Sequence, residues 1–261
     1  MRIPPLYAHR LGRAYGPDSS ATALEGALAA GVDGLETDVC LTADDELVLL
    51  HDPLLSVGTT LDGWAHERSA AEILAAHLRD RDGEPSDEHP LTLDRLLAST
   101  PAEMPLQLEV KAHADPELAA RTARVLCERH SGPSERRRIE VISFHSAAVA
   151  VAAAHGYRSR LVIHADYTPE ALAAWAVQHG IAGVSVEHFL LSPALTRVFA
   201  LAGLSVTTGT INDPELLLRV TETADPDAVC TDRPGELRAG AAELGLDVRR
   251  VAAGEPLALA S

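Results

Sequence analysis

The 261-residue sequence is poor in basic and in aromatic residues, and both shortages exclude classes of partner. It has 22 lysines and arginines against 38 aspartates and glutamates, which gives a formal net charge of −16. Nucleic acids and anionic membranes bind basic surfaces, so neither is an expected partner. Aromatic residues make up 3% of the chain, which is little for stable membrane association. An anionic substrate must therefore be attracted by a local feature, such as a metal ion or a few basic side chains.

Paired cysteines and long apolar segments are also missing. Cys40, Cys127 and Cys230 are widely spaced and form neither a CxxC pair nor a zinc-site spacing. We therefore expect reduced thiols, as in a cytoplasmic protein. No stretch reaches about 18 consecutive apolar residues, the length of a transmembrane helix, and residues 1–10 contain no run typical of a signal peptide. The sequence thus predicts a soluble cytoplasmic protein.

Segment 34–52 carries the strongest chemical signal. Glu36 and Asp38 lie two apart in a strand pattern, and side chains alternate along a strand, so both carboxylates share one face. An apolar run at 47–50 then ends abruptly at His51. Unpaired buried carboxylates are costly, which favours a bound cation as their explanation. Exposure on an edge strand, with His51 merely ending the next strand, explains this segment equally well when it is taken alone.

A second strand of the same design follows at 106–111. Apolar residues alternate there with polar ones that include Glu109 and Lys111, so one face is apolar and the other polar. Two strands with acidic inner faces and apolar outer faces fit a barrel that is covered by helices and has its chemistry at the mouth. Glu109 then becomes a third carboxylate beside Glu36 and Asp38.

Strand and helix patterns alternate regularly along the chain. This alternation predicts an α/β fold, a (β/α)8 TIM barrel in a single catalytic domain of residues 1–245, with a small excursion after the second strand and a C-terminal tail at 246–261. Nine strands are predicted, and eight remain if 47–50 is an adjunct to the second; they are 6–9, 34–40, 47–50, 106–111, 139–144, 160–164, 183–187, 204–208 and 228–231. The predicted helices are 18–30 (capped by Asp18 or Ser19), 69–77, 93–98, 116–129, 147–155, 168–179, 193–202, 213–223 and 234–244.

In such barrels the reactive side chains lie where strands end and loops begin. This rule gathers His9, Arg10, Glu36, Asp38, His51, Glu109, Lys111, His145, His164, Glu187 and Asp232 at the mouth. Three carboxylates without a cysteine favour a hard divalent cation, Mg²⁺ or Ca²⁺, over zinc. Arg10 and Lys111 suit the oxygens of a phosphate. His9 and His51 suit acid–base catalysis near neutral pH.

The other mouth residues carry a weaker signal. His145, His164, Glu187 and His188 are placed to line a substrate pocket, and a purely structural role at a strand end is an equal alternative for each. The remaining histidines lie in predicted helices or loops and are interpreted as surface residues: His66, His77, His89, His113, His130, His155 and His179.

Taken together, these residues resemble the motifs of the glycerophosphodiester phosphodiesterase family. That family combines an HR(G) strand end, a PENT-like helix start, an E-x-D strand, an HD motif and an E-x-K strand. Here they stand as His9-Arg10, PDSS at 17–20, Glu36-Thr37-Asp38, His51-Asp52 and Glu109-Val110-Lys111, and TIND at 210–213 and TDRP at 231–234 are similar to the family's C-terminal signature. The resemblance covers about residues 6–240.

The resemblance implies a role for each matched residue: cation binding by Glu36, Asp38 and Glu109, acid–base catalysis by His9 and His51, and phosphate binding by Arg10 and Lys111. It also implies a reaction in which a neighbouring glycerol hydroxyl attacks phosphorus and expels the alcohol, before the cyclic phosphate is hydrolysed. The chain departs from the family pattern at four places that bear on the substrate: Leu11 replaces the usual glycine, Asp18-Ser19 replaces Glu-Asn, no arginine follows the HD motif, and Gly209 stands where tryptophan is common.

The resulting hypothesis is a divalent-metal-dependent hydrolase. It converts a small-molecule glycerophosphodiester, or a related phosphodiester, to an alcohol and glycerol 3-phosphate. Two alternatives stay open: a lyase of the phospholipase D-toxin type that stops at the cyclic phosphate, and a non-catalytic barrel that binds a phosphorylated ligand. The sequence names neither the alcohol group nor the divalent ion.

Overall fold

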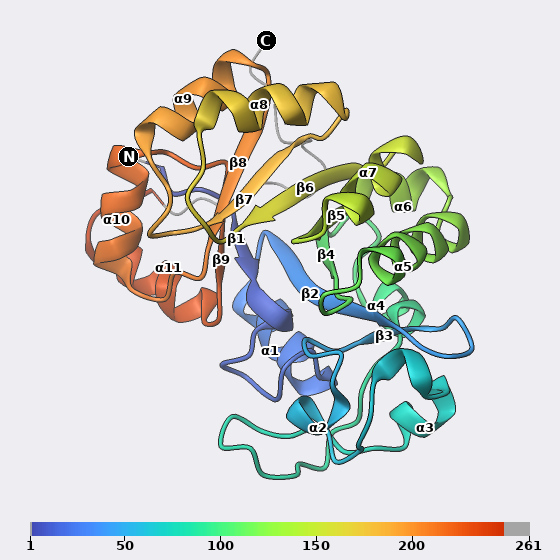
Figure 1. Cartoon of the computed structure of the whole chain (residues 1–261). Coiled ribbons are helices and arrows are strands. Elements are labelled where there is room, and N and C mark those ends of the chain that lie inside the picture. Colours follow the sequence, from blue (N-terminus) through green and yellow to red (C-terminus); the bar gives the residue numbers. More distant parts are fainter. Residues whose placement is uncertain (1, 248–261) are drawn as a thin grey trace.

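The strand that carries Glu36 and Asp38 forms one wall of a closed barrel. The computed structural model describes residues 2–247 of the chain. The barrel strands are β1 (Leu6–Ala8), β2 (Gly34–Leu41), β4 (Leu106–Val110), β5 (Ile139–Ser143), β6 (Arg158–Ile163), β7 (Gly183–Glu187), β8 (Ser205–Gly209) and β9 (Ala228–Thr231). They are parallel and run in the order β1-β9-β8-β7-β6-β5-β4-β2, and the β1–β2 pairing closes the ring (Figure 1). The predicted (β/α)8 barrel is therefore confirmed.

Helices cover the outside of the barrel because the outward faces of its strands are apolar (Figure 1). Leu106, Leu108 and Val110 of β4 are buried in one cluster with Ala123 and Leu126 of the helix that follows. Full burial of an aliphatic side chain of this size contributes roughly 1.5–3 kcal/mol. The helices between the strands are α1 (Ala21–Ala30), α4 (Leu93–Ser99), α5 (Pro116–Arg129), α6 (Pro133–Arg138), α7 (Ser146–Ala154), α8 (Pro169–Gln178), α9 (Pro193–Leu201), α10 (Pro214–Thr223) and α11 (Pro234–Glu243).

The remaining strand, β3 (Leu47–Leu49), opens the predicted excursion. It pairs antiparallel with β2 and lies outside the closed ring, as expected for an adjunct strand. Three short helices follow: α2 (Leu55–Gly58), the 3-10 helix η2 (Ala65–Glu67) and α3 (Ala70–Leu74). The excursion has a small core of its own, in which Leu55 and Ile73 pack with Val48 of β3. It is therefore attached firmly beside β2 and α1 (Figure 1).

A buried ion pair fills the amino-terminal end of the barrel, opposite the mouth. Arg160 of β6 is 1% exposed, and its Nε lies 2.9 Å from a carboxylate oxygen of Glu140 on β5. Arg160 also donates a hydrogen bond to the carbonyl of Ser205, and Gln107 donates one to Glu140. Burial opposes the charge of Glu140, but Arg160 and Gln107 outweigh it and lower the pKa of Glu140 below its usual value. We call these residues the floor cluster.

Helix boundaries differ from the prediction at three places. The cap of α1 is Ser20, whose side chain accepts a hydrogen bond from the amide of the third helical residue, rather than Asp18 or Ser19. Ser19 has a left-handed φ of 58°, whereas a capping residue needs an extended backbone. The predicted helix 69–77 ends at its sixth residue. Helix α6 was not predicted because it buries no side chain and so has no apolar period.

The end of the chain lies only partly within the described residues. Of the predicted tail at 246–261, residues 248–261 lie outside the described part. Leu246 is buried in a cluster with Ile3 and Leu237, and Asp247 forms a β-bridge with Arg2. Between residues 2 and 247, no helix combines the length and the apolar character that crossing a membrane requires.

Candidate active site

Three carboxylates meet at the carboxyl ends of β2 and β4. Glu36 and Asp38 come from β2, and Glu109 of β4 lies directly opposite Asp38 in the parallel register. One oxygen atom from each of the three lies within 4.8 Å of the other two. The three residues are 3%, 1% and 8% exposed. The alternation of side chains along two adjacent strands therefore brings three buried acids to one point, and we call this group the mouth triad.

Lys111 lies against the mouth triad. Its ammonium group is 3.0 Å from Asp38 Oδ1 and 2.5 Å from Glu109 Oε1. Burial opposes this charge, but the two carboxylates raise the pKa of Lys111 above its usual value. Lys111 is also the single lysine of the whole sequence. One ammonium group contacts two of the three acids, so the triad keeps an excess of negative charge.

The three carboxylates respond differently to this shared environment. Burial, together with the charges of Asp38 and Glu109, raises the pKa of Glu36 well above its usual value. Burial also raises the pKa of Glu109, although Lys111 opposes the change. For Asp38 the effect of burial is outweighed by Lys111 and His51, which lower its pKa. Like charges at this distance disfavour full ionisation unless a further cation is bound.

The donor set of the mouth triad fits a hard divalent cation. Carboxylate oxygens are the ligands that Mg²⁺ and Ca²⁺ prefer, and the triad contains no thiol. Asp38 Oδ2 is buried and has no hydrogen-bond donor among the described residues. Arg10 Nε lies 3.9 Å from this oxygen, which is too far for a hydrogen bond, and a buried carboxylate oxygen without a donor is costly, so a ligand at this point is physically favoured. Glu36, Asp38 and Glu109 are the residues that would hold such an ion.

His9 stands beside the triad in a fixed orientation. Its Nδ1 lies 2.7 Å from Asp232 Oδ1, and its Nε2 lies 4.0 Å from Glu36 Oε2. Asn212 donates a hydrogen bond to the other oxygen of Asp232, and so holds that carboxylate in place. Burial opposes the charge of Asp232, but the hydrogen bonds from His9 and Asn212 keep its pKa below its usual value. Because Nδ1–H donates to Asp232, Nε2 of the neutral ring is free to accept a proton.

His51 lies at the mouth because it follows the end of β3 by two residues. Its Nδ1 lies 3.1 Å from Asp52 Oδ2, and this hydrogen bond lowers the pKa of Asp52. His51 lines the same pocket as Glu109 and Lys111, so its ring lies near the triad. Both histidines therefore lie beside the three acids, and each is oriented by an aspartate.

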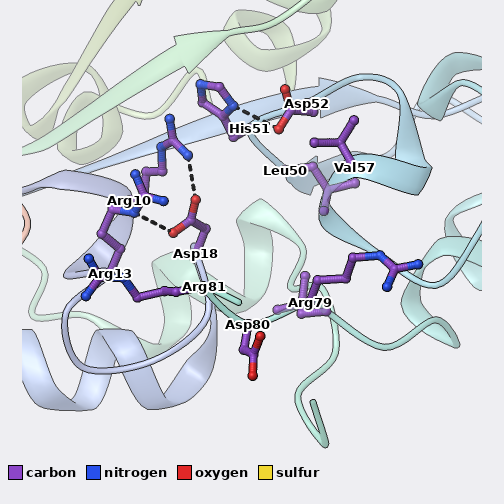
Figure 2. Close-up of a pocket in the computed structure, with 12 residues that line it drawn as sticks. Arg10, Arg13, Asp18, Leu50, His51, Asp52, Val57, Arg79, Asp80 and Arg81 are labelled. Carbon is purple, nitrogen blue, oxygen red and sulfur yellow. Dashed lines mark hydrogen bonds and ion pairs between the residues drawn. The ribbon is translucent and has the colours of Figure 1, made fainter. Parts of the chain in front are cut away.

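The segment after β1 has an unusual backbone that brings Arg10 to the triad. Arg10 and Leu11 have positive φ angles of 49° and 61°, a conformation that favours glycine. Leu11 is 0% exposed, so burial of its side chain offsets that cost. The amide of Arg10 donates a hydrogen bond to Glu36. Its guanidinium pairs with Asp18 at 2.5 Å, and Arg13 pairs with the same carboxylate at 2.9 Å (Figure 2).

His51 lines two pockets, one that it shares with Arg10 and one that it shares with Glu109 of the mouth triad. The Arg10 pocket has a volume of about 190 Å³ and is shown in Figure 2; its polar lining includes Arg10, Arg13, Asp18, His51, Arg79 and Arg81. The Phe144 pocket has a volume of about 480 Å³, and its lining includes His51, Pro53, Lys111, His113, Phe144, His145 and His164. The residues around the triad thus offer one smaller polar space and one larger space with an aromatic wall.

The weaker sequence predictions have mixed outcomes in the structure. His145 and His164 line the Phe144 pocket, whereas Glu187 lines neither of the two pockets. His113 is exposed, as predicted, but the interpretation as a mere surface residue needs correction because it lines the Phe144 pocket. It follows β4 by three residues, so it also lies in a loop at the carboxyl end of a strand.

Several residues at the site were not assigned a role from the sequence. The strand-end rule gathers Asp232 at the mouth but indicates no function for it, and Asn212 stands in the sequence only within the TIND motif. Their hydrogen bond makes them one unit with His9. Arg79 and Arg81 reach the Arg10 pocket from the excursion, and no local motif marks them.

Comparisons with known proteins agree with this geometry. Residues 9–236 match the model of the Glycerophosphoryl diester phosphodiesterase family. Among curated proteins, Probable glycerophosphodiester phosphodiesterase 2 of Mycobacterium tuberculosis (strain ATCC 25618 / H37Rv) is 28% identical over 234 residues, which cover 85% of this chain and 84% of that protein.

Solved structures share the fold. A protein from Silicibacter pomeroyi DSS-3 that carries the family's name has a TM-score of 0.84 at 21% identity, with 95% of this chain and 96% of that chain covered. A phosphodiesterase from Oleispira antarctica, solved in complex with its product sn-glycerol-3-phosphate, has a TM-score of 0.76 at 23% identity, with 92% and 97% covered. At these identities the likeness shows the barrel fold.

Proposed function

The chain belongs to the glycerophosphoryl diester phosphodiesterase family, and from that premise we propose that it hydrolyses a glycerophosphodiester with a divalent cation, giving an alcohol and sn-glycerol 3-phosphate. The observation that carries the proposal is the meeting of three buried acids with two aspartate-oriented histidines at one barrel mouth. The similar Oleispira antarctica phosphodiesterase binds sn-glycerol-3-phosphate as its product, which is consistent with this choice of product.

Glu36, Asp38 and Glu109 are proposed to hold the cation. Bound there, Mg²⁺ or Ca²⁺ would supply Lewis-acid stabilisation of charge on the phosphoryl oxygens. Arg10 and Lys111 are proposed to donate to the same oxygens from either side, because a guanidinium and an ammonium both carry several N–H donors. Negative charge on the phosphoryl oxygens grows as the reaction approaches its transition state. These donors therefore stabilise the transition state more than they stabilise the bound substrate.

His9 and His51 are proposed to move the protons. In the first step a glycerol hydroxyl attacks phosphorus, its proton passes to His9 Nε2, and the bond from phosphorus to the alcohol oxygen breaks while His51 protonates that oxygen. In the second step water attacks the cyclic phosphate and gives a proton to His51. The ring bond between phosphorus and the attacking hydroxyl oxygen breaks, and His9 returns its proton to that oxygen. Asp232 keeps the proton-accepting nitrogen of His9 directed at the triad.

Activity and metal binding test the proposal separately. We expect EDTA to abolish hydrolysis, and His9→Ala or His51→Ala to lower kcat by about 10²- to 10⁴-fold. His179→Ala is the matched control, because that exposed histidine stacks on Trp175 outside the barrel and should leave kcat unchanged. Full activity of both active-site variants would contradict the proposal. Phosphorus NMR of the product separates complete hydrolysis from a lyase that stops at the cyclic phosphate.

The single lysine gives a direct report on the metal site. In protein labelled with ε-¹⁵N-lysine, the only lysine side-chain signal belongs to Lys111, whose ammonium contacts Asp38 and Glu109. Titration with Mg²⁺ or Ca²⁺ should shift this signal, since the ion competes for the same carboxylates. Glu36→Gln should weaken the response. If the Lys111 signal does not shift with either ion, the mouth triad is not the cation site.

A further inference from the structure

The two pockets that share His51 differ in size and in chemistry. The Arg10 pocket is smaller, about 190 Å³, and Arg10, Arg13 and Asp18 line it with polar groups. The Phe144 pocket is larger, about 480 Å³, and Phe144 and Pro53 contribute to a mainly apolar lining. A glycerophosphodiester has two unlike ends, a small polyol and a variable alcohol. The polar pocket matches the glycerol end, and the larger one matches the alcohol.

Phe144 is the largest apolar side chain that lines the larger pocket. It is 41% exposed although it is among the largest apolar side chains in the chain. Its ring is held on two sides, since His164 packs edge-on with centroids 5.1 Å apart and Lys111 Nζ lies 5.6 Å from the ring centre. An aromatic ring that is fixed but still exposed inside a pocket gains free energy when a flat or apolar group covers it.

The wall next to Phe144 is built rigidly. His113 has a left-handed φ of 47°, which is unfavourable for a residue with a side chain. His145 Nε2 donates a hydrogen bond of 2.7 Å to the carbonyl of His113, and Trp64 packs on the His113 ring with centroids 5.1 Å apart. Strained backbone that is held by such contacts is a recurrent feature of ligand-binding sites.

The charges around the pocket disfavour a cationic alcohol. Within the described residues, Glu109 is the one carboxylate in its lining, and Lys111 already pairs with it at 2.5 Å. The ammonium of Lys111 also lies over Phe144, where a quaternary ammonium group would otherwise find its aromatic contact. A positively charged alcohol therefore finds neither a free counterion nor a free ring partner here.

We propose, building on the proposed function, that the Phe144 pocket holds the alcohol leaving group and selects uncharged, flat or apolar alcohols over quaternary-ammonium alcohols. Phe144 is then a specificity-determining residue that contacts the alcohol. His51 lines both pockets, which is consistent with its proposed role as the group that protonates the leaving oxygen.

The test compares diesters that share glycerol phosphate and differ in the alcohol. We expect kcat/KM to be higher for the 4-nitrophenyl ester of glycerol phosphate than for glycerophosphocholine. Phe144→Ala should lower kcat/KM about tenfold for the aryl ester, mainly through KM, and change it less than about twofold for bis(glyceryl) phosphate. Phe189→Ala is the matched control, because Phe189 is 69% exposed and lies outside the lining of this pocket.

A binding measurement keeps the inference testable without turnover. Phenyl phosphate and glycerol 3-phosphate are titrated by calorimetry into the metal-loaded enzyme and its Phe144→Ala variant. The inference predicts about tenfold weaker binding of phenyl phosphate alone in the variant. Equal losses for both ligands, or a preference for glycerophosphocholine, would overturn it. Absence of hydrolysis with every diester would refute the proposed function instead, and the phenyl phosphate titration would still decide the inference.

Discussion

The mouth triad and the floor cluster are two groups of buried charge at opposite ends of one barrel. At the floor, Arg160 faces Glu140 at 2.9 Å, and Gln107 satisfies the same carboxylate. At the mouth three acids share the charge of Lys111, and the pKa of Glu36 is raised well above its usual value by burial and by its acidic neighbours. The charge of Glu140 in the floor cluster is therefore neutralised within the protein, whereas the mouth triad keeps an excess of negative charge.

This difference distinguishes a cluster that stabilises the fold from one that we propose to bind a cation. A buried pair with all its hydrogen bonds costs little once it is formed, but breaking it leaves an uncompensated charge. A buried group with surplus charge lowers the free energy of unfolding of the ligand-free protein. Proteins retain such a group where a ligand of opposite charge compensates it. TIM barrels in general place chemistry at the carboxyl ends of the strands and stability at the other end. Charge removal should thus have opposite consequences in the two clusters.

The largest effect is expected at the mouth. Glu36→Gln removes one of three repelling charges and keeps the shape of the side chain, so the metal-free protein should be as stable as the wild type or more stable. Hydrolysis should fall by at least about a thousandfold, because the proposed cation loses a charged ligand. Urea unfolding in EDTA and kcat with saturating Mg²⁺ measure the two effects. A variant that loses stability but keeps its activity would reverse the assignment.

The floor should respond in the opposite way. Arg160→Met leaves Glu140 buried without its main partner, and the free energy of unfolding should fall by about 3–5 kcal/mol. The folded fraction should keep the wild-type kcat, since Arg160 contacts no residue of the mouth triad that the structure records. Adding Glu140→Gln should recover part of the loss, because the remaining charge is then removed. Loss of kcat without loss of stability would contradict this division.

The barrel and the mouth triad follow from local patterns in the sequence. Glu36, Asp38 and Glu109 alternate with apolar residues in two strands, and period-two alternation is visible in a single sequence. The strand register then places Glu109 opposite Asp38 with no further information. His9 and His51 follow in the same way, because each comes at the end of an apolar run.

The floor cluster and the pockets depend on contacts that no local pattern records. Glu140 and Arg160 are ordinary strand residues in the sequence. The β5–β6 register places Arg158 opposite Glu140, and Arg160, two residues further along β6, also reaches that carboxylate. Arg81 reaches the Arg10 pocket because of the path of the whole excursion. Ser19 looks like a helix cap in the sequence, and only its left-handed backbone moves that role to Ser20.

The pH dependence of stability should have opposite signs at the two ends. The folded pKa of Glu140 is lowered, so its contribution is present above its usual pKa of about 4.5 and is lost as the pH falls through the folded value. The folded pKa of Glu36 is raised, so in metal-free protein stability is highest below the usual value and declines as the pH rises. Urea midpoints of the wild type, Glu140→Gln and Glu36→Gln between pH 4 and 8 in EDTA test this. If the urea midpoints of the two variants change with pH in the same way, the two clusters do not differ in their effect on stability.

The smallest effect is expected at Gln107, the residue of the floor cluster that lies on the same strand as Glu109 of the mouth triad. It is opposite Glu36 in the β2–β4 register, yet its side-chain amide donates to Glu140 at 2.8 Å. Gln107→Leu removes the hydrogen bond to Glu140 and a weaker one from Cys230 Sγ, while Arg160 still neutralises Glu140, so the free energy of unfolding should fall by about 1–2 kcal/mol. Activity should change less than about twofold, as measured by kcat/KM on the preferred diester. A large loss of activity with little loss of stability would contradict the assignment of Gln107 to the floor cluster.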